Sequence, residues 1–206
     1  MKIRYHTHSF TLLICIIYVM IVPQKLLAQS LENDQRSSFK PAFSVSGSFA
    51  PYSFKAWGKV RNSRQLFLNI GFTHTELEFL SFRTQLSSEL IVSGLVRYPL
   101  DGRDGDRNTL FGIGMIPLIA NMPLNQKPTH PFITSSVGFI VTHSQFPNLN
   151  GARLNFLLGL GAGYQFISGN QSPIQVGWKL SHLSNGFTAP ENPGIDSVML
   201  FVNFLF

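Results

Sequence analysis

The sequence predicts an all-β fold, an eight-stranded antiparallel transmembrane β-barrel of the outer-membrane type. Three observations support this prediction. Charged residues make up only 13% of the 206 residues, and 19 residues are Phe, whereas a soluble domain usually carries about 25% charged residues. Beyond residue 28 there is no apolar run of about 18 residues, the minimum for a spanning helix. Between turns, apolar residues alternate with polar or small ones, as they do in barrel strands.

The first 28 residues have the pattern of a signal peptide. Lys2 and Arg4 form a positive start, residues 10–22 are almost entirely apolar, and the small residue Ala28 precedes a polar stretch. The apolar run is shorter than the roughly 20 residues of a spanning helix. Cys15 lies inside this run, which argues against a lipoprotein signal. We therefore expect a cleaved signal peptide at 1–28, a flexible N-terminal segment at 29–40 and a transmembrane barrel at 41–206.

The mature chain carries little net charge and no thiol. Removing the leader takes away the only cysteine and three of the 16 basic residues, which leaves 13 basic against 10 acidic residues. The sequence lacks the cluster of basic residues that is typical of nucleic-acid-binding proteins. The remaining histidines show no ligand spacing with carboxylates that would indicate a metal site. We expect no nucleic-acid partner, no metal and no cofactor.

Nine strand-like segments, divided by turn-rich stretches, fill the rest of the chain. They are residues 41–54, 65–77, 79–86, 89–99, 110–120, 131–144, 152–168, 173–185 and 195–206. Because a bacterial barrel has an even number of strands, we expect eight, with segment 79–86 merging with a neighbour.

Alternation within these segments predicts which face each side chain occupies. In residues 65–73, 154–166 and 174–180 the even positions are large and apolar, whereas many odd positions are polar or glycine. Successive strand residues point to opposite faces, and small residues suit the narrow interior of a small barrel. A soluble sandwich also alternates, but the long aromatic-rich face opposite a glycine-rich face favours the barrel.

Three polar residues interrupt the apolar faces of the last two strands. His182 and Ser184 have the parity of the apolar positions before them, and Asp196 has the parity of the apolar positions after it. An antiparallel hairpin brings these strand ends together. A serine attacks only when a base takes its proton, and a carboxylate fixes the tautomer of an imidazole base. The three residues are therefore a candidate catalytic triad.

The turn beside these residues contains candidate donors for an oxyanion. Asn185, Asn192 or the loop amides around Gly186 could stabilise the charge that develops when a serine attacks an ester. The alternative is an interfacial polar cluster where the strands leave the membrane, and the pattern alone does not separate the two. The other histidines of the mature chain are interpreted as structural polar residues, His74 and His143 near strand ends and His130 in a loop.

At these residues the sequence resembles the PagL lipid A 3-O-deacylase family. The similarity is densest in the C-terminal part, where His182-x-Ser184-Asn185 is followed by a loop with Asn192 and then by an acidic residue at 196. The resemblance implies an eight-stranded barrel in the bacterial outer membrane. It also implies hydrolysis of the ester at position 3 of lipid A without a cofactor.

The resemblance implies a role for each matching residue. Ser184 would be the nucleophile, His182 the base and Asp196 the acid, while Asn185 and Asn192 match family asparagines important for activity and proposed near the oxyanion. In the family the acid is Glu, which is longer by one methylene. We therefore expect either that the backbone brings Asp196 closer to His182 or that a water joins them.

The resemblance also implies a substrate, and two alternative functions are kept beside it. The substrate would be lipid A or lipopolysaccharide among the outer-membrane lipids, its phosphates held by basic residues at the rim, with Lys179 and Arg153 as candidates. One alternative is a non-enzymatic structural or adhesive barrel. Another is a phospholipid esterase with the same triad. Whether the barrel forms a homodimer is left open.

Overall fold

The computed structural model describes residues 42–79, 82–100, 106–146, 150–167 and 172–206. The predicted signal peptide at 1–28 and the segment at 29–40 lie outside the described residues. In the described part, no helix is long and apolar enough to cross a membrane.

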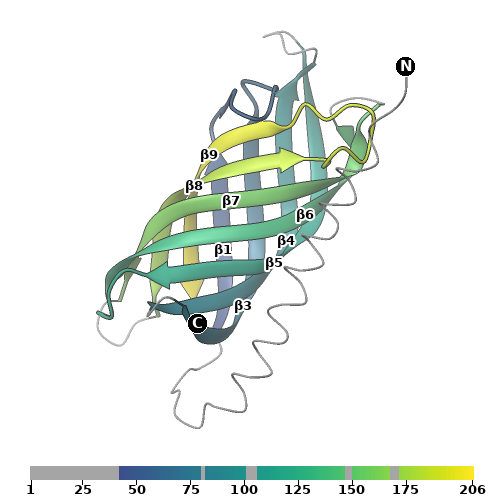
Figure 1. Cartoon of the computed structure of the whole chain (residues 1–206). Coiled ribbons are helices and arrows are strands. Elements are labelled where there is room, and N and C mark those ends of the chain that lie inside the picture. The colour runs from purple at the N-terminus through teal and green to yellow at the C-terminus, as the bar shows by residue number, and fades with distance from the viewer. Residues whose placement is uncertain (1–41, 80–81, 101–105, 147–149, 168–171) are drawn as a thin grey trace.

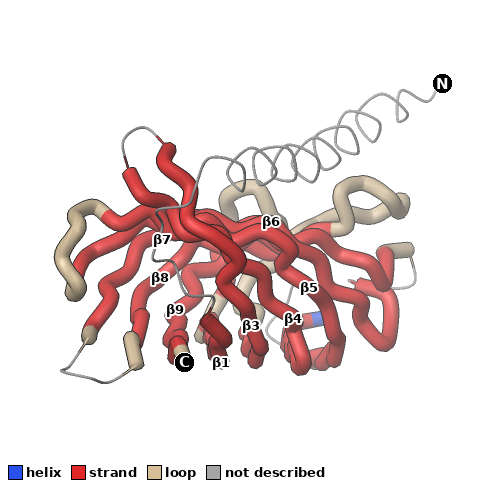
Figure 2. The backbone as a smooth tube through the Cα atoms, turned by 90° about the horizontal axis from the view of Figure 1, so that it is seen from below, coloured by secondary structure: helices blue, strands red, loops and turns tan. Residues whose placement is uncertain are grey.

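The chain forms a closed antiparallel sheet. Its strands are β1 Ala42–Ala50, β2 Ser53–Phe54, β3 Arg64–Phe79, β4 Phe82–Pro99, β5 Arg107–Pro123, β6 His130–Phe146, β7 Ala152–Phe166, β8 Ile174–Ser184 and β9 Ile195–Leu205. From β3 onward each strand pairs with the next, and β1 pairs with both β3 and β9 (Figures 1 and 2). The barrel therefore has eight strands, and β2 is a short addition that pairs with the start of β9.

One prediction about strand boundaries is confirmed and another is wrong. Segment 79–86 does merge with a neighbour, since its residues from 82 onward form one strand with 89–99. The prediction of one strand at 41–54 is wrong, because the chain leaves the β1 ladder after Ala50. Pro51 has no N–H to donate to a ladder, and the chain resumes pairing only at Ser53, now against β9.

The barrel is apolar outside, whereas its interior combines polar side chains with a buried apolar cluster that includes Val96, Ile140 and Met199. Large side chains at alternate positions are exposed on the outer face, for example Leu68, Leu160 and Trp178, whereas Gln65, Asn69 and Gln175 between such positions are buried. This distribution is the reverse of a soluble protein and matches a lipid-facing wall. The faces predicted for residues 65–73, 154–166 and 174–180 are therefore confirmed.

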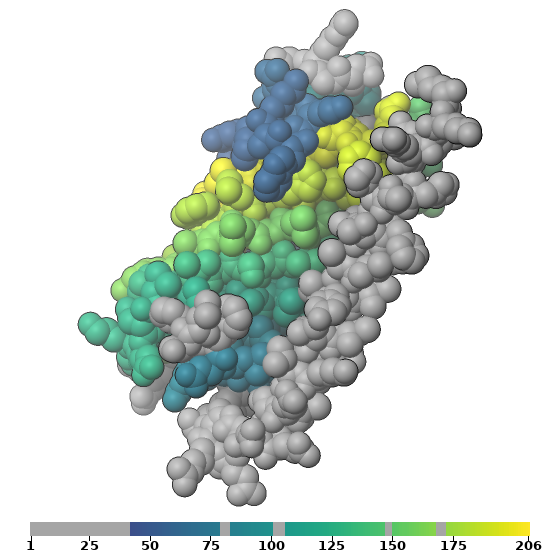
Figure 3. Space-filling view, in the orientation of Figure 1, coloured from purple at the N-terminus to yellow at the C-terminus, as the bar shows by residue number. Residues whose placement is uncertain are grey.

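Two long connections meet at one end of the barrel. The β1–β3 loop (residues 51–63, including β2) lies against the β8–β9 loop (residues 185–194), because Lys59 N–H donates to Pro193 O and Val60 forms a parallel bridge with Ile195. Figure 3 shows the β1–β3 loop as a blue protrusion beside the yellow β8–β9 region. Outer-membrane barrels have short periplasmic turns and longer extracellular loops, so we assign this end to the extracellular side.

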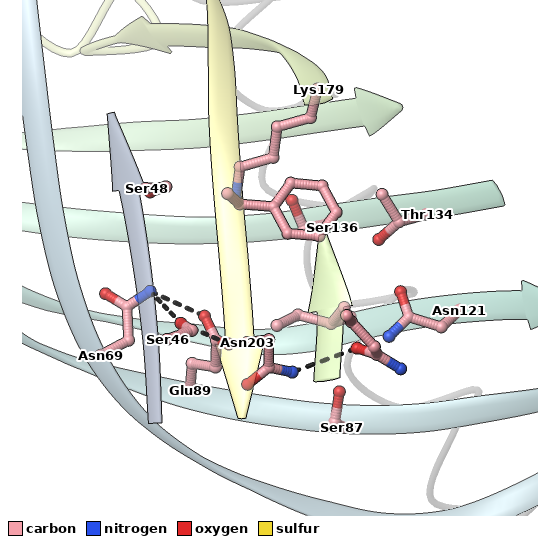
Figure 4. A pocket seen from close by; sticks show the side chains of 13 residues that line it. Ser46, Ser48, Asn69, Ser87, Glu89, Asn121, Thr134, Ser136, Lys179 and Asn203 are labelled. Atoms are coloured by element: carbon pink, nitrogen blue, oxygen red, sulfur yellow. Dashed lines mark hydrogen bonds between the residues drawn. The ribbon is translucent and has the colours of Figure 1, made fainter. Parts of the chain in front are cut away.

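The barrel interior holds a polar network (Figure 4). Asn69 Nδ2 donates to Glu89 Oε2 (2.8 Å) and to Ser46 Oγ (3.0 Å), and Ser46 Oγ donates to Glu89 Oε1 (2.9 Å). Lys179 lines the same cavity, which measures about 40 Å³. Hydrogen bonds between buried side chains of β1, β3 and β4 help to specify how these strands are aligned.

Candidate active site

His182 and Asp196 form a direct pair on the outer wall of the barrel. The two residues are opposite each other in the β8–β9 register. His182 Nδ1–H donates to Asp196 Oδ1 over 2.6 Å. The shorter acid therefore reaches the ring without a water. In a neutral imidazole, a proton on Nδ1 leaves Nε2 free to accept one, which is the tautomer that a general base requires.

The β1–β3 loop holds the second oxygen of Asp196. Ala56 N–H (3.1 Å) and Gly58 N–H both donate to Asp196 Oδ2. Asp196 is consequently only 4% exposed, although its strand position faces outward. Charge-assisted hydrogen bonds from backbone amides stabilise an ionised carboxylate and fix its orientation. No local sequence pattern indicates this loop's role, because its contact with Asp196 joins distant parts of the chain.

Close packing keeps the β1–β3 loop against the site. A Cβ on Gly58 would lie 2.8 Å from backbone atoms of Gly194, so only glycine permits this approach. Gly194 itself has a φ of +61°, which also favours glycine. Trp57 lies between Ala56 and Gly58 in the sequence, and its ring stands edge-on to the His182 ring, with centroids 6.0 Å apart. The loop thus contacts both members of the His–Asp pair.

Ser184 lies beside this pair on the same outward face. It is two residues from His182, which separates the two Cα atoms by roughly 6.6 Å along a strand, and it is 8% exposed. Among the described residues, Ser184 Oγ has no hydrogen bond to the His182 ring, although both side chains line one groove. Such hydrogen bonds are often long without substrate and shorten in the reactive complex.

The groove over these residues is open and mostly apolar. It has a volume of about 420 Å³ and is lined by Trp57, Val137, Phe156, Leu158, His182, Ser184, Gly186, Phe187, Asn192, Pro193 and Gly194. Phe156 and Leu158 of β7 stand opposite Ser184 and His182 in register. Below them the wall continues with the exposed side chains of Leu160 and Leu180. An acyl chain can therefore lie along this wall with its polar end beside Ser184.

The β8–β9 loop is organised by Asn185. Its side chain is buried, and its Nδ2 donates to Glu191 O (2.6 Å) while its Oδ1 accepts the Phe187 N–H (3.0 Å). The Asn185 backbone N–H donates to Asn192 Oδ1 (2.9 Å). Asn185 is thus occupied in holding the loop. Asn192 and Gly186 both line the groove, and with its oxygen fixed by Asn185, Asn192 has its amide N–H groups available as donors.

Two sequence interpretations are wrong. Lys179 is no candidate for holding phosphates outside the barrel, because its odd position in β8 points into the interior cavity. His130 is the first residue of β6 rather than a loop residue, and its side chain is bound to Lys127 O (2.7 Å). Arg153 is exposed near the extracellular rim of β7.

In the described part of the chain, no group of three His, Cys, Asp or Glu residues is placed to hold a metal ion.

Fold and site together define an outer-membrane barrel with a His–Asp–Ser arrangement on its lipid-facing wall. The family model of lipid A 3-O-deacylase (PagL) matches residues 29–204. The chain belongs to this family. It is therefore an outer-membrane protein of a family of lipid A deacylases, which are hydrolases, and the predicted family and location are confirmed.

Solved structures agree with the barrel. The crystal structure of the outer membrane enzyme PagL is 18% identical, with a TM-score of 0.52, and the match covers 80% of this chain and 98% of that one. Neisserial surface protein A (10% identity, TM-score 0.42, 82% and 100% covered) and Ail of Yersinia pestis (13%, 0.40, 82% and 100%) are also similar. No curated protein matches the chain. The predicted eight-stranded barrel is confirmed.

Proposed function

We propose that the protein hydrolyses the ester-linked 3-hydroxyacyl chain at position 3 of lipid A. Ser184 is the nucleophile, His182 the general base and Asp196 the acid that orients His182. The observation that carries this proposal is the 2.6 Å hydrogen bond between His182 Nδ1 and Asp196 Oδ1 beside Ser184. This pair lies on the outer wall, where the acyl chains of the outer leaflet contact the barrel.

The proposed reaction follows from these positions. Ser184 Oγ attacks the ester carbonyl while His182 Nε2 takes its proton, and the tetrahedral intermediate forms. Asn192 Nδ2 and the Gly186 N–H, both at the groove, donate to the oxyanion. The ester C–O bond then breaks, and His182 gives the proton to the departing sugar oxygen, which leaves as a hydroxyl. A water activated by His182 releases the fatty acid from Ser184.

The lipid environment explains why the site is on a wall rather than in a cavity. A soluble esterase must bury its acyl substrate, but here the lipid around the barrel already surrounds the chain. The groove needs only to admit the ester and to exclude other polar groups. All residues of the proposed site come from one barrel, and the reaction needs neither a cofactor nor a homodimer.

A serine pair in β8 provides the test. Ser184 faces outward, whereas Ser181 in the same strand is 6% exposed, faces the interior and stands opposite Ser197. We expect cells that express the wild type or Ser181→Ala to lose the 3-linked acyl chain from their lipid A, and cells with Ser184→Ala to retain it. Mass spectrometry of extracted lipid A measures this difference.

The same extracts separate the alternatives. Free fatty acid derived from phospholipid, with lipid A intact, would identify a phospholipid esterase. Equal deacylation by Ser184→Ala and wild type would reject Ser184 as the nucleophile. Intact lipid A and phospholipid in cells with a folded wild-type barrel would favour a non-enzymatic role.

A further inference from the structure

The β1–β3 loop and the first residue of β3 carry only positive charge. Lys55, Lys59, Arg61 and Arg64, here called the basic rim, are all exposed. Residues 51–64 contain no Asp or Glu. The four residues are separated by uncharged ones and form no continuous block, so the basic rim is not evident from the sequence.

The basic rim is joined directly to the candidate active site. Lys55 precedes and Lys59 follows the two residues whose amides bind Asp196. The Lys59 backbone donates to Pro193 of the groove. Any ligand that contacts these lysines therefore also approaches the groove beside His182.

A second and independent observation lies on the neighbouring strands. Arg64 of β3 stands directly opposite Arg97 of β4, and both are exposed. Like charges that face each other across strands are destabilising. Within the described ranges the only ion pair joins His182 and Asp196, so none of these cations has a described carboxylate partner. Two facing arginines at a rim are stabilised when an anion binds between or beside them.

The charge differs across the groove. The β8–β9 loop on its other side contains Glu191 and no basic residue, and the wall below the groove is apolar. This distribution favours one orientation of a ligand with an anionic head and acyl chains. In that orientation the anionic group is over the β1–β3 loop and the chains are along the outer wall of β7 and β8.

We propose that the basic rim binds a phosphate group on the sugar headgroup of lipid A and so places the neighbouring acyl ester over Ser184. This inference rests on the proposed function and adds the part of the substrate that sets its orientation. The bound phosphate is the substrate's own, because the rim and the nucleophile lie on the same groove. Arginine binds phosphate oxygens in pairs, whereas lysine acts as a point charge.

The test compares phosphorylated and dephosphorylated substrate. We would assay purified wild type and Lys55→Gln/Lys59→Gln/Arg61→Gln in neutral detergent micelles, with lipid A bearing its phosphates and with the same lipid after their removal. A control variant, Arg83→Gln/Lys127→Gln, removes two exposed positive charges at the opposite end of the barrel. Native-like migration of unheated samples on gels reports that each variant is folded.

We expect the basic-rim variant to raise KM for phosphorylated lipid A on the order of tenfold, since each cation near an anionic lipid surface contributes a modest amount. Its kcat should change little, and the control should match the wild type. On dephosphorylated lipid A, wild type and variant should have the same KM. Added salt should raise KM for the wild type on the phosphorylated lipid only.

Two outcomes would overturn the inference while leaving the proposed function intact. One is an unchanged KM of the variant on phosphorylated lipid A, and the other is an equal rise in KM on both substrates. If the triple variant does not fold, Lys59→Gln and Arg61→Gln singly should each raise KM about threefold on phosphorylated lipid A alone. Failure of the folded wild type to release acyl chain from either lipid would instead reject the proposed function.

Discussion

Two carboxylates are almost equally buried in this barrel but face opposite sides of its wall. Asp196 is 4% exposed and Glu89 is 8% exposed. Glu89 points into the interior, where side chains of Asn69 and Ser46 satisfy both of its oxygens. Asp196 points outward, where an imidazole binds one oxygen and two backbone amides of the β1–β3 loop bind the other.

The comparison shows that burial alone does not identify a reactive group. Glu89 has no route to the lipid, because the wall of the barrel separates its cavity from the membrane. Asp196 is buried by a loop that leaves His182 and Ser184 on an open groove. Strand parity and access therefore separate an interior carboxylate within a polar network from an outer carboxylate beside the groove, and only the outer one is placed for the proposed reaction.

The largest expected effect is that of Asp196→Asn. The amide cannot stabilise the charged imidazole and favours the wrong His182 tautomer, so we expect kcat for lipid A deacylation to fall about ten-thousandfold. The barrel should remain folded, because the Asn side chain has nearly the same shape. Steady-state assays with purified protein in micelles measure this change.

Glu89→Gln is the matched change on the opposite face. It removes the same charge from an equally buried position, and we expect kcat to remain within about twofold of the wild type, since surface and structural changes away from a site leave chemistry intact. A comparable loss of kcat in both variants would show that the two carboxylates act through stability rather than through position.

The next largest effect is expected for Gly58→Ala. The added Cβ would lie within 2.9 Å of backbone atoms of Gly194 and Ile195, so the loop must move away and its amides must release Asp196. A displacement of about 1 Å at a catalytic group can cost about a hundredfold in rate, and we expect that loss in kcat. Gly47→Ala is the control, because its Cβ would meet only the Leu68 side chain at 3.7 Å. Equal activity of the two variants would show that the loop does not position Asp196.

Much of this architecture could be predicted from local pattern. Period-two alternation predicts which residues face the lipid, and the same parity places His182, Ser184 and Asp196 on the outer wall. The error at Lys179 was avoidable, since its odd position matches the inward-facing Gln175. The face that a side chain occupies depends only on its position along one strand, so the sequence alone predicts it.

The contribution of the β1–β3 loop could not be predicted in this way. Gly58 and Asp196 are 138 residues apart, and their contact depends on closure of the barrel between β1 and β9. No short pattern in residues 51–63 indicates two amides aimed at a distant carboxylate. The basic rim was missed for a related reason, because Arg64 and Arg97 become neighbours only through the β3–β4 register.

A smaller effect, on stability rather than rate, is expected for Lys179→Met. Lys179 lines the cavity that contains Glu89, and its loss leaves that carboxylate without a nearby cation. We expect a loss of about 1–2 kcal/mol in the free energy of unfolding, below the value for fully dry ion pairs because the cavity has room for water. Urea unfolding in phospholipid vesicles measures it.

The double variant Lys179→Met/Glu89→Gln sharpens this result. If the two groups interact, removing both should cost less than the sum of the single changes. All three variants should deacylate lipid A at the wild-type rate, because the interior does not contact substrate. Additive losses would mean that each side chain stabilises the barrel through separate contacts.

The smallest effect is expected at Trp57, which joins the loop to the groove. Trp57→Ala removes the edge contact with the His182 ring and one wall of the groove, and aromatic contacts of this kind contribute about 0.5–1.5 kcal/mol. We expect KM to rise about threefold with kcat nearly unchanged, and Trp57→Phe to restore most of the loss. Trp178→Ala, lower on the same outer wall, is the control because it does not line the groove. A fall in kcat with a shifted pH profile would instead show that Trp57 acts on His182 itself, which would extend the functional part of the outer wall from Asp196 to the whole β1–β3 loop.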